Sequence, residues 1–257
     1  MKVVVCIPAR YESSRFPGKV LAQATGRYLV QHTYEQACRA KLPTEVIIAA
    51  DDPRVMRAAH AFGARCVLTS SEHQSGTDRI AEAVTDIEAD IVVNLQGDEP
   101  EIDPGHIDQV AEILIANQMA EGSEQKASMA TLGAPLASPE QIANPNIVKV
   151  ITDLAGHAIY FSRSVIPYDR DAQGIGVAGQ HLRHIGMYAY CRDFLLKITT
   201  LPQSPLEKLE KLEQLRVIEN GYSILVGKIE HACDGIDTPE QYAEFVKRDQ
   251  TRTDTAH

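Results

Sequence analysis

Short apolar runs alternate with amphipathic stretches through the first half of the chain, and this alternation limits what the chain can fold into. Between the runs, apolar residues recur at helical spacing, at 30–38 and again at 80–87. Strands that alternate with helices are typical of βαβ units, so we expect an α/β fold with a mostly parallel central sheet. The predicted strands of this half are 3–7, 45–49, 65–68 and 90–95.

The second half is less regular and predicts an added antiparallel portion. Capping boxes at Ser138, Ser204 and Thr238 mark helix starts, because a hydroxyl and an acid or amide three residues later satisfy free backbone donors reciprocally. We expect the helix after Ser204 to be long. Asp52-Pro53 predicts an N-cap followed by proline at the first helical position. The predicted strands of this half are 146–152, 157–161, 182–190 and 222–226.

Charge and composition exclude several classes of partner. The 257 residues carry a formal net charge of -10 and no basic cluster with interleaved aromatic residues, so the chain would repel a nucleic-acid backbone. No stretch approaches the roughly 20 apolar residues of a membrane span. The apolar run 3–7 ends too early for a signal peptide, and the five cysteines form no CxxC pair, which indicates reduced thiols. We therefore expect a cytoplasmic protein with no nucleic-acid and no membrane partner.

The first strand leads into a loop, 8–19, that contains three cations, two adjacent serines and a glycine. Ligands of open α/β sheets bind outside the carboxyl ends of the strands, and a loop with cations and free backbone N–H groups suits a polyphosphate. The loop is not a Walker A sequence, because it lacks the paired glycines and Lys19 is not followed by Ser or Thr. A solvated basic loop is the alternative interpretation. Its cations are Arg10, Arg15 and Lys19.

Two aspartates are candidates for a metal site. Asp98 follows the predicted strand 90–95, so it is expected at the same sheet edge as the basic loop. Magnesium uses few protein carboxylates and completes its shell with water and substrate phosphate, so one such aspartate beside a phosphate loop is a sufficient anchor. Asp237 precedes the capped helix at Thr238. The alternatives are turn chemistry for Asp98 and a favourable helix dipole for Asp237.

Three further patterns carry weaker signals. The segment 73–79 precedes a predicted helix, where its polar groups suit either a ligand or simple helix capping. Gly174-Ile-Gly-Val-Ala-Gly179 matches the dinucleotide fingerprint in letters, but no apolar strand precedes it and no periodic helix follows, so we interpret it as a loop. His181 and His184 could face one another only on a helix, whereas 182–190 alternates like a strand, which argues against a zinc pair.

Taken together, blocks spread over nearly the whole chain resemble the 3-deoxy-manno-octulosonate (Kdo) cytidylyltransferases, also called CMP-Kdo synthetases. Each block alone is a moderate signal, but their order along the chain makes the resemblance specific. The blocks are IPARYESSRFPGK at 7–19, HQSGTDR at 73–79, VNLQGDEP at 93–100, NPNIVK at 144–149, YFSR at 160–163, LRHIG at 182–186, LEQLR at 212–216 and GIDTP at 235–239.

The resemblance implies a nucleotide-diphospho-sugar transferase fold whose smaller antiparallel portion forms a homodimer. It implies a single nucleotidyltransferase domain, 1–257, with about 1–130 and 195–257 as the nucleotide-binding core and 131–194 as the sugar-binding and dimerisation portion. The implied reaction converts CTP and Kdo to CMP-Kdo and pyrophosphate for lipopolysaccharide biosynthesis, with Mg²⁺ as cofactor.

The resemblance also implies residue roles. Catalysis would use Lys19, Arg10, Asp98 and Asp237, of which Asp98 and Asp237 would hold the metal. The nucleotide would lie against Ala9, Arg10, Ser13, Arg15, Lys19, Ser75, Arg79 and Gln96. The acidic sugar would lie against Arg163, His184, Tyr188, Glu213 and Gln214.

Alternative functions stay open at this stage. The same chemistry on 8-amino-Kdo or a sialic acid would fit the same residues. The glycines at 174, 176 and 179 alone suggest a nicotinamide-dependent oxidoreductase. Titration with nucleotides would separate this function from nucleotide transfer, because CTP with magnesium should bind to a cytidylyltransferase and NAD should not. A binding or scaffold protein without catalysis would have no need for the two aspartates.

Overall fold

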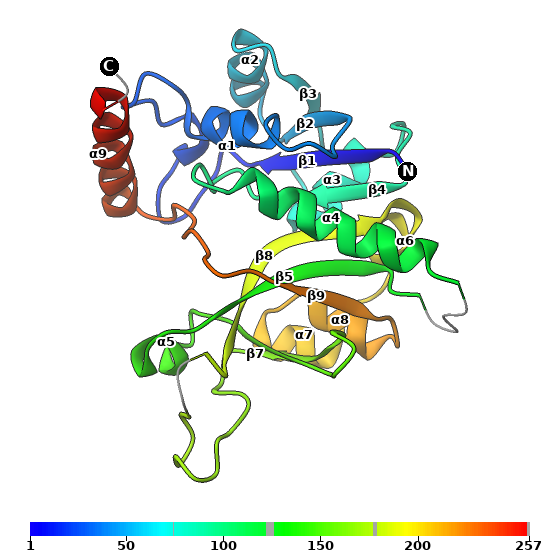
Figure 1. Cartoon of the computed structure of the whole chain (residues 1–257). Helices are drawn as coiled ribbons and strands as arrows, with labels where there is room; N and C mark the ends of the chain where they lie inside the picture. Colours follow the sequence, from blue (N-terminus) through cyan, green and yellow to red (C-terminus); the bar gives the residue numbers. More distant parts are fainter. Residues whose placement is uncertain (74, 122–125, 177–178, 256–257) are drawn as a thin grey trace. The chain divides into compact units, whose positions relative to one another are not determined.

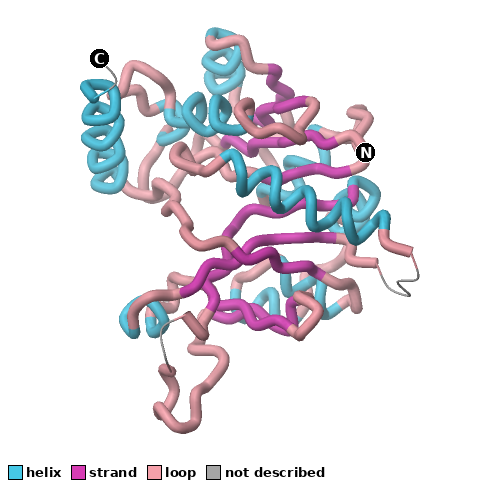
Figure 2. The backbone as a smooth tube through the Cα atoms, in the orientation of Figure 1, coloured by secondary structure: helices cyan, strands magenta, loops and turns pink. Residues whose placement is uncertain are grey.

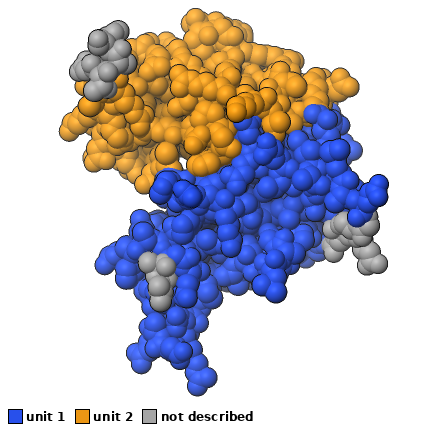
Figure 3. Space-filling view, in the orientation of Figure 1, with its two compact units in different colours: residues 1, 90–93, 108–232 blue, residues 2–89, 94–107, 233–257 orange. Residues whose placement is uncertain are grey.

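The computed structural model describes residues 1–73, 75–121, 126–176 and 179–255, with the side chains of the last three omitted. These residues form two compact units, shown in Figure 3. Unit 1 comprises residues 1, 90–93 and 108–232, and unit 2 comprises 2–89, 94–107 and 233–257. The chain therefore leaves unit 2 and returns to it twice.

Unit 2 contains three parallel strands in the order β3-β2-β1 (Figure 1). They are β1 (Val3–Ala9), β2 (Glu45–Ala50) and β3 (Arg65–Leu68), and every residue of β1 is buried. The helices α1 (Leu29–Ala37), α2 (Pro53–Ala61) and α3 (Gly76–Ala83) alternate with these strands along the chain (Figure 2). This alternation confirms the βαβ prediction, because parallel neighbours require a crossover between them.

Local capping explains where these helices begin. The Asp52 side chain accepts a hydrogen bond from the backbone N of Arg54 at 2.7 Å, and Pro53 occupies the first helical position, as predicted. Ser75 Oγ accepts a hydrogen bond from the backbone N of Asp78 at 3.0 Å and caps α3. Both caps lie just beyond the carboxyl side of a strand, so they fix how the chain turns there.

The end of the chain returns to unit 2 as α9 (Pro239–Thr255). Its start is capped by Thr238, whose Oγ1 accepts from the backbone N of Gln241, while Gln241 Oε1 accepts from the backbone N of Thr238 at 3.1 Å. An apolar cluster of Leu29, Ile236, Tyr242 and Phe245 then joins α9 to α1, with Phe16, Ala22 and Val246 packed against it. This cluster holds the segment before α9 beside the loop that follows β1.

Unit 1 contains the antiparallel portion. There β5 (Met129–Pro135) pairs in parallel with β9 (Ile224–Lys228) and antiparallel with β8 (Leu182–Cys191). β6 (Lys149–Thr152) pairs antiparallel with both β7 (Ala158–Ser162) and β8. The fold is thus mixed α/β, with a mostly parallel sheet and some antiparallel strands, which confirms the predicted class.

Further elements complete the chain. The strand β4 (Ile91–Asn94) and the helix α4 (Pro104–Met119) cross the boundaries between the units along the chain. A short 3-10 helix, η1 (Lys19–Leu21), belongs to unit 2. Unit 1 also holds α5 (Pro139–Ala143), α6 (Arg192–Ile198), α7 (Pro205–Glu210) and α8 (Gln214–Glu219). None of the helices in the described ranges is long and apolar enough to cross a membrane.

The long helix expected after Ser204 is a wrong prediction. The capping box with Glu207 is present, but α7 ends at Glu210, and the next residue, Lys211, has a left-handed backbone with φ 56°. A left-handed residue ends the run of helical hydrogen bonds, and α8 starts again three residues later. The glycine triplet begins in irregular structure, at Gly174 and Gly176, and its positions 177–178 lie outside the described residues.

Candidate active site

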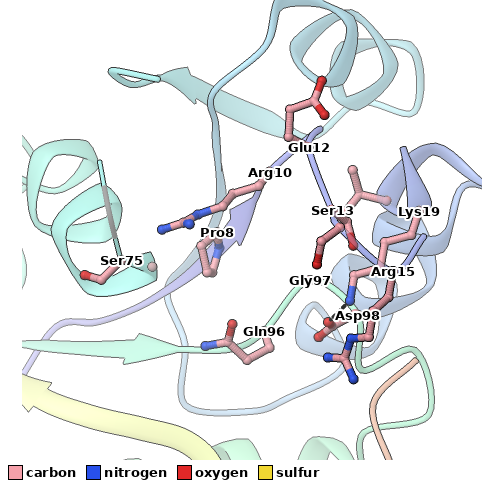
Figure 4. Close-up of a pocket in the computed structure, with 13 residues that line it drawn as sticks. Pro8, Arg10, Glu12, Ser13, Arg15, Lys19, Ser75, Gln96, Gly97 and Asp98 are labelled. Atoms are coloured by element: carbon pink, nitrogen blue, oxygen red, sulfur yellow. Dashed lines mark hydrogen bonds and ion pairs between the residues drawn. The ribbon is translucent and has the colours of Figure 1, made fainter. Parts of the chain in front are cut away.

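Unit 2 contains a cavity of about 410 Å³ beside the carboxyl end of β1 (Figure 4). Its walls come from the loop after β1, the start of α3 and the segment that follows β4. All three are positions where polar groups collect in open α/β folds. The cavity is lined by Pro8, Arg10, Glu12, Ser13, Ser14, Arg15, Lys19, Val20, Ser75, Gly76, Gln96, Gly97 and Asp98.

Hydrogen bonds hold the loop after β1 at both ends. Near its start, the backbone N of Tyr11 donates to Asp51 Oδ1 at 2.9 Å. At its end, the backbone N of Gly18 donates to the Tyr11 carbonyl at 3.0 Å. Gly18 has a φ of 68°, a left-handed conformation that glycine adopts without a steric penalty. The loop is thereby closed on itself, with 12–15 along the cavity wall.

Arg10 brings a buried donor to the cavity that has no partner. Its Nη2 atom is buried and makes no hydrogen bond to any described residue. A guanidinium nitrogen left in this way is expensive unless an anion or water satisfies it. Because Arg10 lines the cavity, an anionic ligand there would supply the missing acceptor.

Lys19 brings the two candidate metal aspartates together. Its Nζ donates to Asp98 Oδ2 at 2.5 Å, to Asp237 Oδ1 at 3.0 Å and to the Ile236 carbonyl at 3.0 Å. Burial alone lowers the pKa of Lys19, but the Asp98 and Asp237 carboxylates outweigh it, and the net effect is a raised pKa. The far oxygen of Asp237 pairs with Arg15 Nη2 at 2.9 Å.

The segment after β4 sits tightly against β1. A Cβ on Gly97 would lie 3.0 Å from the Pro8 carbonyl oxygen, closer than most real contacts, so any other residue would require the neighbouring backbone to shift. Thr33 Oγ1 donates to the Gly97 carbonyl at 3.2 Å, and the backbone N of Ile236 donates to the Asp98 carbonyl at 2.8 Å. These contacts hold the backbones of both aspartate segments in place independently of their side chains.

Arg79 and Ala9 do not line the cavity. The Arg79 side chain is fully buried, and its guanidinium donates to Thr69 Oγ1 at 2.6 Å and contacts Asp51 at 3.5 Å. Burial is the main cause of its lowered pKa. Ala9 is buried at the end of β1. Arg79 instead lines a smaller cavity of about 220 Å³, which shares Arg10 and Glu12 with the first, and its partner Asp51 accepts from the backbone N of Tyr11 in the loop.

The other predicted nucleotide residues do line the cavity. Ser75 and Gly76 form the start of α3, and Gln96 donates from Nε2 to Asn94 Oδ1 at 2.9 Å. Glu12 in the wall and Asp51, which accepts from the backbone N of Tyr11, were not among the predicted site residues. Asp51 follows β2 directly, so the same strand-edge rule that selected Asp98 would have found it.

The two aspartates fit a magnesium ion. Their oxygens converge on one cationic point, the Lys19 ammonium, and their side chains are 25% and 43% exposed. Among the described residues, no cluster of three or more His, Cys, Asp or Glu side chains could hold a metal ion. A site with two carboxylates suits Mg²⁺, which takes its remaining ligands from water and phosphate oxygens.

Four of the predicted sugar residues lie close together in unit 1. The Tyr188 hydroxyl donates to Gln214 Oε1 at 3.3 Å, and the rings of His184 and Tyr188 are 5.3 Å apart. Burial, followed by the charge of Glu213, raises the pKa of Tyr188. Burial and the neighbouring Arg183 lower the pKa of His184 to about 3, so this imidazole is neutral.

Arg163 is tied to its own surroundings in unit 1. Its backbone N donates to Glu210 Oε2 at 3.0 Å, and its guanidinium donates to the carbonyls of Glu210 and Pro145 at 2.8 and 3.1 Å. Beneath it, the buried Lys149 ammonium donates to the carbonyls of Asn144, Ile147 and Arg163. The NPNIVK block is therefore a scaffold for Arg163.

Comparison with known proteins identifies the family. A cytidylyltransferase family model matches residues 4–226. The chain is 49% identical to a 3-deoxy-manno-octulosonate cytidylyltransferase of Solibacter usitatus, over 93% of this chain and 91% of that protein. The protein of the same name from Geobacter metallireducens is 46% identical, over 96% and 98%. The chain belongs to this family.

A solved structure agrees with this assignment. The structure of CMP:2-keto-3-deoxy-manno-octonic acid synthetase complexed with CTP matches with a TM-score of 0.90 and 39% identity. The match covers 98% of this chain and 100% of that one. As a cytidylyltransferase, the chain is a nucleotidyltransferase enzyme, as the resemblance predicted.

Proposed function

We propose that the enzyme transfers CMP from CTP to Kdo and releases pyrophosphate. The observation that carries the proposal is the convergence of Lys19, Asp98 and Asp237 at a cavity lined by Arg10, whose buried Nη2 has no hydrogen-bond partner among the described residues, in a chain of this family. In the reaction, the anomeric hydroxyl oxygen of Kdo attacks the α-phosphorus of CTP. The bond from that phosphorus to the β-phosphate oxygen breaks, and the hydroxyl proton is lost.

The cavity residues would bind and orient the triphosphate. Arg10, Arg15 and Lys19 supply charge, Ser13 supplies a hydroxyl, and Ser75 and Gln96 line the wall where the nucleoside would lie. Phosphoryl transfer leaves the protein mainly positioning and charge stabilisation to perform. By analogy with oxyanion donors, loss of one such contact costs about 3 kcal/mol in the transition state.

Asp98 and Asp237 would hold Mg²⁺. The bound ion would neutralise phosphate charge and orient the α-phosphate toward its acceptor. The two aspartates lie on segments that are hydrogen-bonded to each other through Ile236 and Asp98, which favours a defined spacing of their carboxylates.

The acidic sugar would bind the unit 1 cluster of Arg163, His184, Tyr188, Glu213 and Gln214. His184 is neutral there, so it would act as a hydrogen-bonding group and not as a fixed charge. Gln214 Nε2 is buried and makes no hydrogen bond within the described chain, which leaves an amide donor for a ligand. Either 8-amino-Kdo or a sialic acid is the alternative acceptor.

The remaining parts of the proposal extend the family resemblance. They are that the enzyme is a homodimer, that it works in the cytoplasm and that its product enters lipopolysaccharide biosynthesis. Size-exclusion chromatography with light scattering would test the first of these directly.

The metal role is tested by Asp98→Asn and Asp237→Asn. Each substitution keeps the side-chain shape but removes the charge, so we expect turnover to fall by about 10²–10³-fold, as for loss of other transition-state charge partners. Asp86→Asn is the matched control, because Asp86 is exposed in the same unit. Pyrophosphate release at saturating magnesium is the measurement. Turnover like that of the control in either variant would contradict the metal role.

The substrate assignment is tested by pyrophosphate release from each of the four nucleoside triphosphates. Each is combined in turn with Kdo, 8-amino-Kdo and a sialic acid. We expect CTP with Kdo to give the highest kcat/KM. A higher value with another acceptor would leave the chemistry intact and reassign the sugar.

A further inference from the structure

The Lys19 ammonium occupies the point on which the two predicted metal ligands converge. We infer that Lys19 is an exchangeable counter-cation that competes with a divalent metal for Asp98 and Asp237 until a triphosphate draws it away. The inference deepens the proposed function and rests on it only for the identity of that triphosphate. Its consequence is that metal and nucleotide bind together, and that the free protein binds the metal weakly.

The Lys19 ammonium already uses all of its hydrogen-bond donors. An ammonium has three N–H donors, and all three are used, on Asp98 Oδ2, Asp237 Oδ1 and the Ile236 carbonyl. Lys19 therefore has no donor left for a phosphate in this arrangement. To bind the triphosphate, as proposed, it must release at least one carboxylate.

The backbones of the Asp98 and Asp237 segments stay in place when Lys19 moves. The Asp98 segment is held by the backbone N of Ile236, and the backbone N of Asp237 donates to Gln241 Oε1 at 2.8 Å. Neither contact involves Lys19. Lys19 itself has a flexible four-carbon stem and begins the short η1. The carboxylates can thus remain as a preformed pair while the ammonium leaves.

The charges around Asp98 and Asp237 link binding of the metal to binding of the triphosphate. Lys19 and Arg15 together balance the two aspartates, since Arg15 pairs with the second oxygen of Asp237 at 2.9 Å. A divalent cation added to this group would produce a local excess of positive charge. The anionic triphosphate removes that excess by accepting both the ammonium and the metal. Coupling of this kind is reciprocal, so each ligand strengthens binding of the other.

Direct Mn²⁺ titration, followed by electron paramagnetic resonance without nucleotide or sugar, tests the inference. We expect Lys19→Met to bind Mn²⁺ at least about tenfold more tightly than the unmodified protein, which corresponds to ~1.4 kcal/mol. Arg15→Met is the matched control. Its side chain is 64% exposed, and within the described part of the chain its ion pair is with Asp237 and not with Asp98, so a smaller gain is expected. Lys19→Met with Asp237→Asn should lose the gain.

Equal or weaker Mn²⁺ binding by Lys19→Met would overturn the inference, provided that its circular dichroism spectrum matches that of the unmodified protein. Lys19→Gln serves as the second variant if Lys19→Met does not fold, and the same outcomes apply to it. The titration involves no turnover. Failure of cytidylyl transfer would therefore overturn the proposed function separately, with the Mn²⁺ result still standing.

Discussion

A fall in pH should destabilise the protein through His184. This histidine lies in β8 with 9% of its surface exposed, and its Nε2 is 3.1 Å from Thr131 Oγ1. Its ring packs edge-on against Phe161 at 4.9 Å. Burial and then Arg183 lower the pKa of His184 from 6.5 to about 3. Unfolding returns the imidazole to water, where it binds a proton more readily.

The direction of the change in stability depends on whether the folded or the unfolded chain binds more protons. Between pH 6.5 and pH 3 the unfolded chain holds the proton and the folded chain does not, so stability falls as the pH falls through this window. The slope approaches about 1.4 kcal/mol per pH unit below pH 6.5. From pH 7 to pH 5, His184 should account for about 2 kcal/mol of lost stability.

Urea unfolding at pH 7, 6 and 5 measures this loss. His184→Gln keeps a hydrogen-bonding group near Thr131 but does not titrate, so its free energy of unfolding should change less between pH 7 and pH 5 than that of the unmodified protein, by about 2 kcal/mol. The lowered pKa of the buried His32 is common to both proteins and cancels in the difference. His60→Gln, at an exposed position of α2, is the control. If the pH dependence of His184→Gln matches that of this control, the argument from burial is wrong.

Three substitutions test other parts of the fold. Arg216→Met removes the cation that pairs with the Glu207 carboxylate, which is only 5% exposed, so we expect a loss of ~3–5 kcal/mol in urea unfolding. Lys149→Met removes the buried ammonium that donates to the carbonyls of Asn144, Ile147 and Arg163, and should cost ~1–3 kcal/mol by the same assay. Gly97→Ala places a Cβ 3.0 Å from the Pro8 carbonyl and should cost ~1–3 kcal/mol, with weaker CTP binding by calorimetry. For any of these variants, a free energy of unfolding equal to that of the unmodified protein would contradict the prediction made for it.

The sequence predicted the elements whose signals are local. The N-cap at Asp52 and the capping box at Ser204 were found because each uses side chains within a few residues of the helix start. β1 was found because a short apolar run ends at a loop of charged residues. In these cases the information lies within one turn or one strand, so no tertiary contact was needed.

Other elements required tertiary information. β5 was missed because its buried run contains Gly133 and ends at Pro135, and a strand that is nearly all buried lacks alternation. The end of α7 was missed because nothing in the local sequence requires a left-handed Lys211. Burial of the Arg79 side chain has no local signal either, because charged residues are usually exposed and only its contacts with Thr69 and Asp51 account for it.

The two aspartates of the site differ in how far their positions could be predicted from the sequence. The position of Asp98 followed from the strand-edge rule, which depends only on the preceding strand. Asp237 lies far later in the chain, and no spacing argument connects it with Asp98. Its convergence on Lys19 depends on the apolar cluster that holds Ile236 and α9 against α1, a contact between distant segments.

The charge balance of the cavity favours the proposal that the nucleotide binds together with a metal. The cations Arg10, Arg15 and Lys19 are matched by the carboxylates of Glu12 and Asp98 in the wall and of Asp237 behind Lys19. With equal numbers of each, these groups offer a triphosphate little net attraction, and the whole chain carries a net charge of -10. If Asp98 and Asp237 hold a metal as proposed, a divalent cation that arrives with the nucleotide would neutralise both aspartates and leave Lys19 and the arginines to the phosphates. On this proposal we expect the protein to bind a metal-bound nucleotide more tightly than the free one.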